Sequence, residues 1–235
     1  MLLVIASRRD EMAWALVARW GRHDARLLAS EDLSATGWRY DPEAPERSIA
    51  VVGGRRVSCR EIRGVFTRLA CVGEWDLPHI VSADRSYVAA EMTAFLMAWL
   101  SALTCPVVNR PRPLCLSGPN WSTELWTRAA FRLGIPVRPV ARHVTPRQTK
   151  TPPADGPASV TTVTVAGSRC FGTDNEVLRD QSRRLAKAAD VSLLGVRFAE
   201  RAGQYVFLGA DLWPNPCAAD VADAVLEQLL GENGG

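Results

Sequence analysis

The stretch from Ser82 to Asn109, SADRSYVAAEMTAFLMAWLSALTCPVVN, decides the fold because it joins a long helix directly to a buried strand. Ser82 and Asp84 suit the start of a helix, where side-chain oxygens accept hydrogen bonds from free backbone N–H groups. Apolar residues then recur at helical spacing, at Val88, Met92, Phe95, Leu96, Trp99, Leu100 and Leu103. Cys105–Asn109 is the predicted strand, and the two prolines that follow end it. A long helix leading into a buried strand is typical of α/β folds.

The same alternation of buried strands and amphipathic helices extends outward from this stretch. Further strands are predicted at Leu2–Ala6, Arg26–Ala29, Ser48–Val52 and Gly64–Leu69. Further helices are predicted at Glu11–Trp20, Ser122–Leu133, Glu176–Ala189 and Ala218–Leu230. This order predicts an α/β fold with a largely parallel sheet, whose first half is one open Rossmann-like layer. No GxGxxG follows the first strand, so dinucleotide binding lacks its sequence signature.

Residues 144–159 interrupt the alternation. They contain four prolines, few apolar side chains and no periodicity, which predicts a linker or an exposed loop. Beyond them, residues 160–235 predict a small β-α-β-β-α unit. The predicted organisation is therefore a Rossmann-like unit over residues 1–143, the linker, and a C-terminal unit. We expect the C-terminal unit to pack on the first, because so short a chain buries little core of its own.

Composition limits the class of protein more than its reaction. Hydrophobic residues make up 47% of the 235 residues and charged residues 23%, as in globular proteins. The net charge of +3 is too small to indicate nucleic-acid binding. No apolar run approaches the roughly 18–20 residues that span a bilayer, and charges after Ser7 end the first apolar run. We therefore expect a cytoplasmic protein without nucleic-acid or membrane partners.

The cysteines and histidines point to no metal site. None of the six cysteines forms a CxxC pair or stands at ligand spacing from a histidine. Cys105 and Cys115 flank the predicted strand and loop, and we expect them to be buried thiols. No Ser/His/Asp spacing stands out either, so the sequence identifies no catalytic residue.

Three stretches resemble ATP-grasp ligases, and most closely the ATP-grasp maturases of ribosomally made peptides. The first is a strand with Arg68, a helix with Tyr87 and Glu91, and PVVNRP at Pro106–Pro111. The second is GPNWSTELWTRAAFRLGIPVRP at Gly118–Pro139, similar to the family segment in which a lysine opens a helix. The third is GVRFAERAGQYVFLGADLWPNP at Gly195–Pro216, similar to the family's "G-I-D-F…Y-x-F-L-E-x-N-x-x-P". The resemblance implies a Rossmann-like, pre-ATP-grasp layer followed by the C-terminal part of the ATP-grasp fold.

The residues that hold nucleotide and magnesium in that family are replaced here. Trp121 stands at the position of the phosphate-binding lysine, and Arg197 at that of the aspartate. Gly209 stands at the position of the metal-bridging glutamate, and Asp211 at that of the asparagine. A single carboxylate near a guanidinium favours a salt bridge over a two-ion magnesium site. The resemblance thus implies a degenerate relative that uses no ATP, metal or other cofactor.

The segment between the second and third stretches is also too short. There the family has a central subdomain with a glycine-rich lid over the nucleotide, whereas this chain has the proline-rich residues 144–159. The comparison implies a shortened ATP-grasp-like protein without the nucleotide-clamping subdomain.

Several residues remain candidates for ligand binding. Ligands of open α/β sheets bind beyond the carboxyl ends of the strands, where Arg68, Asn109 and Arg110 lie, with Arg112 in the next loop. Their guanidinium groups would hold a carboxylate or phosphate, or else be solvated or paired with acids such as Glu91.

Two tryptophans complete the candidates, together with Arg197 and Asp211. Trp213 is predicted to lie in a turn, where burial is harder. Trp121 lies five residues before Trp126, a spacing that separates two side chains on one helix.

Two functional classes follow. In the first, the chain is a non-catalytic accessory or peptide-binding protein in peptide or natural-product modification, partnered by a full-length ATP-grasp ligase or a second copy of itself. In the second, it is an ATP-independent enzyme acting on a small carboxylate or peptide near Arg68 and Arg110.

Overall fold

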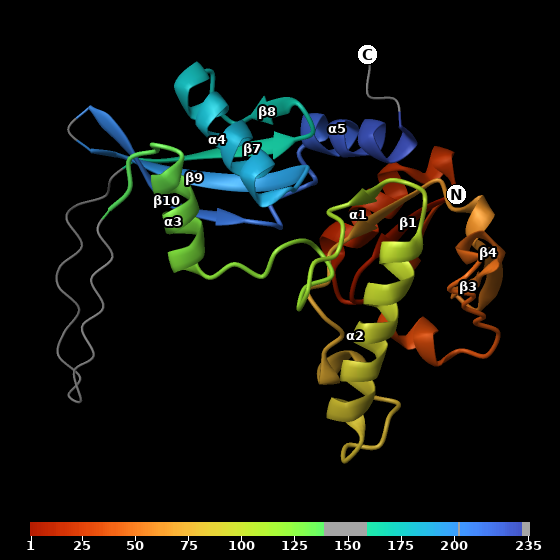
Figure 1. The fold of residues 1–235 in the computed structure, drawn as a ribbon. Helices are drawn as coiled ribbons and strands as arrows, with labels where there is room; N and C mark the ends of the chain where they lie inside the picture. Colours follow the sequence, from red (N-terminus) through yellow and green to blue (C-terminus); the bar gives the residue numbers. More distant parts are fainter. Residues whose placement is uncertain (139–158, 202, 232–235) are drawn as a thin grey trace.

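The computed structural model describes residues 1–138, 159–201 and 203–231 (Figure 1). Its first half is built on a parallel sheet with strand order β2-β1-β5-β6. The strands are β1 (Leu2–Ile5), β2 (Ala25–Leu28), β5 (Gly64–Thr67) and β6 (Val107–Val108). β1 pairs with both β2 and β5, so the chain moves to opposite sides of β1 to reach its two neighbours. This confirms the predicted parallel α/β layer.

The predicted strand at residues 48–52 does not join that layer. It is β3 (Ile49–Val52), which pairs antiparallel with β4 (Arg55–Ser58) as a separate hairpin. The turn is made by Gly53 and Gly54, whose φ angles of 56° and 76° lie in the left-handed region that suits tight hairpins. The expectation of one continuous layer was wrong here, because the tight turn supplies an adjacent partner.

Helices cover both faces of the parallel sheet. Leu3 and Ile5 of β1 face α2 (Arg85–Ala102), while Leu2 and Val4 face α1 (Glu11–Arg19) and α5 (Ala219–Leu230). All four side chains are fully buried, as the alternation of a strand between two helical layers requires. Asp10 caps α1 by accepting a hydrogen bond from the N–H of Ala13 at 3.1 Å.

The second half is an antiparallel sheet with strand order β10-β9-β7-β8. Its strands are β7 (Val160–Ala166), β8 (Arg169–Phe171), β9 (Leu193–Arg201) and β10 (Gln204–Asp211). Two helices, α3 (Thr123–Arg132) and α4 (Glu176–Ala189), share a core with the apolar side chains of one face, including Val163, Val196 and Phe207. The element order differs from the predicted β-α-β-β-α only by the short additional strand β8.

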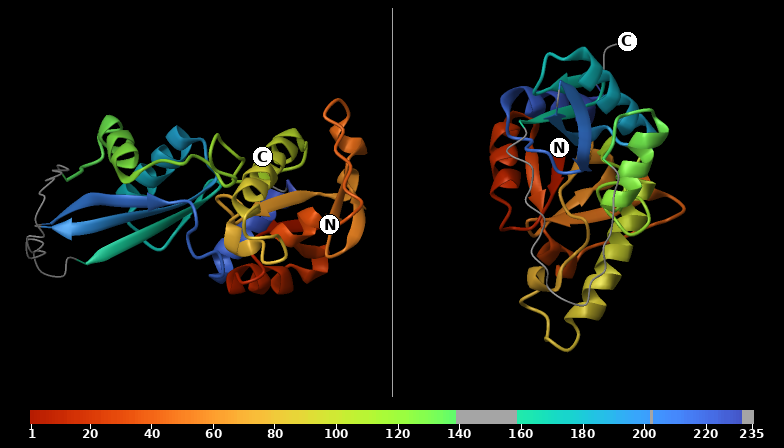
Figure 2. Two further views of the ribbon diagram at one scale, coloured as in Figure 1. Left: turned by 90° about the horizontal axis from the view of Figure 1, so that it is seen from below. Right: turned by 90° about the vertical axis from the view of Figure 1, so that its left-hand side faces the viewer.

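The two halves meet at α5 (dark blue in Figure 2), which contacts β5 and β6 of the parallel sheet and β7 and β8 of the antiparallel sheet. One apolar core contains Phe66 and Val108 of the parallel sheet, Leu193 of the antiparallel sheet, and Val225 of α5. α5 also approaches β5 very closely, since a Cβ built on Gly64 would lie 2.5 Å from the carbonyl oxygen of Leu229.

The remaining sequence predictions are tested only in part. The proposed linker, residues 144–159, lies outside the described residues except for its last residue. In the part of the chain that the structure covers, no helix has both the length and the hydropathy needed to cross a membrane.

Candidate functional site

A cavity of about 370 Å³ lies against the open face of the antiparallel sheet. Two rows of paired residues run beneath it, Thr162–Arg197–Gly209 and Thr164–Gly195–Asp211, and all of these residues except Gly209 line the cavity. A shift of register between Phe207 and Gly209, a β-bulge, places Gly209 opposite Arg197. Bulges often redirect side chains next to binding sites. The face opposite α3 and α4 therefore carries polar and charged residues along these two rows.

The Arg197 guanidinium lies over Gly209. A Cβ built on Gly209 would be 3.3 Å from Nη2 of Arg197, and no other atom would come within 4 Å. The position at which the resembling family has a metal-bridging glutamate thus carries no side chain and is covered by a cation.

Asp211 and the turn that follows it close one side of the cavity. Oδ1 of Asp211 accepts a hydrogen bond from the N–H of Trp213 at 2.9 Å, and Oδ1 of Asn215 accepts one from the N–H of Cys217 at 3.0 Å. These side chains hold the turn, and the ring of Trp213 stays 36% exposed at the cavity.

This arrangement does not fit a magnesium-bound nucleotide. Magnesium requires several oxygen ligands, and carboxylates usually supply them. Asp211 is the only carboxylate among the described residues that line the cavity, and the guanidinium over Gly209 would repel a metal ion. No group of three or more His, Cys, Asp or Glu residues suited to a metal ion occurs among the described residues.

The cleft arginines predicted from the strand ends bind different partners. Nε of Arg68 lies 2.7 Å from Oδ2 of Asp10, and the Arg68 side chain is only 6% exposed. Arg110 instead donates to the carbonyl oxygens of Leu103 and Cys105, just after α2. Each guanidinium therefore binds a group of its own chain. Arg68 binds the residue that caps α1, and Arg110 binds backbone carbonyl groups just after α2.

The other candidates near the parallel sheet, Asn109, Arg112 and Glu91, lie in three different environments. The amide of buried Asn109 donates to the carbonyl oxygen of Leu193 and accepts from the N–H groups of Ser192 and Leu193, which ties the two halves together. Arg112 pairs with Asp190, and Glu91 is exposed on α2.

Trp121 lies before the start of α3, so helical spacing does not govern it. Its ring meets that of Trp126 edge to face, with centroids 4.7 Å apart. The expected separation of the two rings was therefore wrong. Trp121 lines another cavity, together with Arg128 and Arg132 of α3. Of the nine candidates, the structure brings Arg197, Asp211 and Trp213 together in one cavity.

The sequence analysis did not select Thr162, Thr164 or Asn215. A signal for the threonines existed, because they alternate with Val163 and Val165 along β7. Such alternation marks a strand with one buried and one open face. Asn215 offered no comparable pattern, because its place in the cavity depends on the turn after β10.

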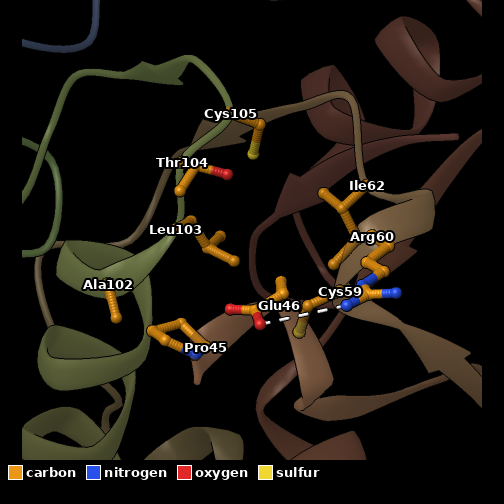
Figure 3. A pocket seen from close by; sticks show the side chains of 9 residues that line it. All are labelled: Pro45, Glu46, Cys59, Arg60, Ile62, Ala102, Leu103, Thr104 and Cys105. Carbon is orange, nitrogen blue, oxygen red and sulfur yellow. Dashed lines mark ion pairs between the residues drawn. The ribbon is translucent and has the colours of Figure 1, made fainter. Parts of the chain in front are cut away.

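A smaller cavity of about 250 Å³ lies near the amino ends of β5 and β6 (Figure 3). Cys59 and Cys105 line it, and Glu46 pairs with Arg60 across it at 3.9 Å. Burial raises the pKa of Cys105 to about 11 and also raises the pKa of Cys59. Both thiols therefore stay protonated at neutral pH, which makes them poor nucleophiles.

Sequence comparison finds no relative, whereas structure comparison finds several. No protein family matches the sequence, and no curated protein does. The macrocyclase MdnC of Microcystis aeruginosa MRC, bound with precursor peptide MdnA, superposes with a TM-score of 0.70 at 12% identity. That match covers 99% of this chain and 100% of MdnC.

Two further solved structures also superpose on almost the whole chain. A RiPP-associated ATP-grasp ligase of Chryseobacterium gregarium, with ADP and a leader and core peptide, gives a TM-score of 0.72 at 10% identity, covering 99% of this chain and 97% of that one. The ATP-grasp ligase PsnB, with minimal precursor, Mg and ADP, gives 0.68 at 14% identity, covering 97% of this chain and 98% of that one. The chain therefore has the fold of the ATP-grasp ligases.

Proposed function

We propose that this chain is a non-catalytic, ATP-grasp-like binding protein of a peptide-modification pathway, and that its cavity holds a carboxylate-bearing ligand rather than ATP. The observation that carries the proposal is the Arg197 guanidinium over Gly209, where the resembling family has a metal-binding carboxylate. A cation without a matching set of carboxylates favours an anionic group and disfavours magnesium.

The structural neighbours support a peptide as the wider partner. MdnC is bound with its precursor peptide, and PsnB is complexed with a minimal precursor. By analogy this chain would bind a peptide, beside a full-length ATP-grasp ligase or a second copy of itself. In this proposal it acts in the cytoplasm, as an accessory protein and not as a ligase.

The shortness of the segment between α3 and β7 supports the same conclusion. The sequence between α3 and β7, residues 133–159, leaves little chain for a lid over a nucleotide. The alternative, an enzyme acting between Arg68 and Arg110, is less favoured, because both guanidinium groups bind other parts of the chain. Arg68 binds Asp10, and Arg110 binds backbone carbonyl groups.

Calorimetry with ATP and magnesium tests the proposal. We expect a dissociation constant no tighter than about millimolar, because the cations and carboxylates that hold the nucleotide are missing. A micromolar constant would overturn the proposal. A second titration uses a synthetic peptide that copies the product of a short reading frame beside the gene. Binding that weakens about tenfold in Arg197→Gln supports a carboxylate contact, since charge-assisted hydrogen bonds contribute roughly 1.5–3 kcal/mol.

A further inference from the structure

The cavity on the antiparallel sheet contains two opposite charges that do not bind each other. Arg197 is paired in register with Gly209, and Asp211 with Gly195, so the two charged residues are diagonal neighbours. Such neighbours have Cα atoms about 7–8 Å apart, within reach of long side chains. Yet in residues 1–138, 159–201 and 203–231 no ion pair joins them.

Other polar groups of the cavity also lack hydrogen-bond partners among the described residues. Asp211 uses one carboxylate oxygen on the N–H of Trp213, and its other oxygen accepts no hydrogen bond from the described residues. The hydroxyl groups of Thr162 and Thr164 have no hydrogen-bond partner within the described chain. Water satisfies such groups until a ligand with matching donors and acceptors displaces it.

Apart from Asn215, the rest of the wall is largely apolar. Phe171 of β8, Trp213 and Pro214 of the turn, and Val221 of α5 line the same space. Glycines occupy positions 195 and 209 between the two charges, and Pro214 packs over Gly195 while the Arg197 guanidinium lies over Gly209. A volume of about 370 Å³ lies near the lower end of the range for small-molecule sites, roughly 300–1,000 Å³. The ligand is therefore small and partly apolar.

We propose that this cavity binds a free α-amino acid with an apolar side chain, its carboxylate on Arg197 and its ammonium group on Asp211. The inference rests on the proposed function in one respect, that the site takes a carboxylate and not a nucleotide. Asp211 would repel the second carboxylate of a dicarboxylate, and Arg197 would repel a simple amine. An internal peptide segment carries neither a free carboxylate nor a free ammonium group. A zwitterion satisfies both side chains at once.

Calorimetry with L-phenylalanine and two blocked forms tests this ligand class. N-acetyl-L-phenylalanine lacks the ammonium group, and L-phenylalaninamide lacks the carboxylate. We expect L-phenylalanine to bind and each blocked form to bind at least about tenfold more weakly, because each loses one charge-assisted hydrogen bond. Equal binding of the acetylated form would overturn the proposal. So would an absence of L-phenylalanine binding, and if the peptide described above still bound, the proposed function would survive that failure.

Variants assign the two charges to the two side chains. Asp211→Asn keeps an oxygen for the N–H of Trp213 and so preserves the turn. It should weaken L-phenylalanine about tenfold and leave the acetylated form unchanged, whereas Arg197→Gln should weaken both. Asp180→Asn and Arg183→Gln, on α4 at the other face of the sheet, are matched controls and should change neither affinity. An equal loss for both ligands in Asp211→Asn would refute the ammonium contact.

Discussion

The two sheets of this protein differ in how much of them is covered. The parallel sheet lies between helices, and the β1 side chains are buried on both faces. The antiparallel sheet is covered by α3 and α4 along one face, whereas on its other face α5 packs near β7 and β8 and threonines, a glycine and charges line a cavity. The covered sheet holds the molecule together, and the half-covered sheet presents the binding groups.

This difference has a physical origin in strand direction. Parallel strands need crossover connections, and the helices in those connections cover both faces of the sheet. Antiparallel strands can be joined by short turns, which leaves a face free for ligands. In this chain that face carries Arg197, Gly209 and Asp211, three of the positions at which the sequence departs from the resembling family.

The largest expected effect concerns the dependence of one sheet on the other. Residues 160–235 expressed alone should be insoluble or unfolded, because Val221, Val225 and Leu229 of α5 pack on the parallel sheet. Cleavage within residues 144–159 should leave the two halves associated. Solubility and thermal melting of the fragment measure this. A soluble fragment with its own sharp transition would show two independent domains. It would contradict the claim that the antiparallel sheet depends on the parallel sheet for its stability.

A smaller but still substantial loss is expected for Gly64→Ala. The added Cβ would lie 2.5 Å from the carbonyl oxygen of Leu229, and neither backbone can move without disturbing the covered sheet. Overpacking of this kind should cost about 3 kcal/mol and lower the Tm by about 6–12 °C. Gly21→Ala is the control, since a Cβ there would meet no atom within 4 Å. Equal Tm values for the two variants would show that α5 is free to shift.

How well the sequence predicted each part depended on whether the signal was local. The bounds of α4 were predicted correctly, because its apolar period, the Asn175 cap and the left-handed Asp190 all lie within one short stretch. Strand β4 was missed, because exposed Arg55 and Arg56 hide its pairing with β3.

The site was harder to predict because it depends on distant contacts. The sequence placed Arg68 correctly at a strand end, but its partner Asp10 is 58 residues away. Similarly, alternation could mark the open face of β7, whereas the register that sets Arg197 over Gly209 depends on a bulge in β10. Local patterns thus predict elements and faces, and only the assembled sheets show which charges share a cavity.

The smallest expected change in stability comes from Gly209→Ala, the counterpart of Gly64→Ala on the open sheet. Its Cβ would meet only Nη2 of Arg197, at 3.3 Å, and that atom ends a long, flexible side chain. The free energy of unfolding should therefore change by no more than about 0.5 kcal/mol, because the guanidinium can move into solvent. Binding should respond more strongly, since the methyl group displaces the cation from the cavity floor and weakens its contact with a ligand carboxylate. Denaturant unfolding and calorimetry on the same preparation separate the two effects. A large loss of stability would show that the open face is as tightly packed as the covered one, and an unchanged affinity would show that Arg197 does not bind the ligand from its place over Gly209.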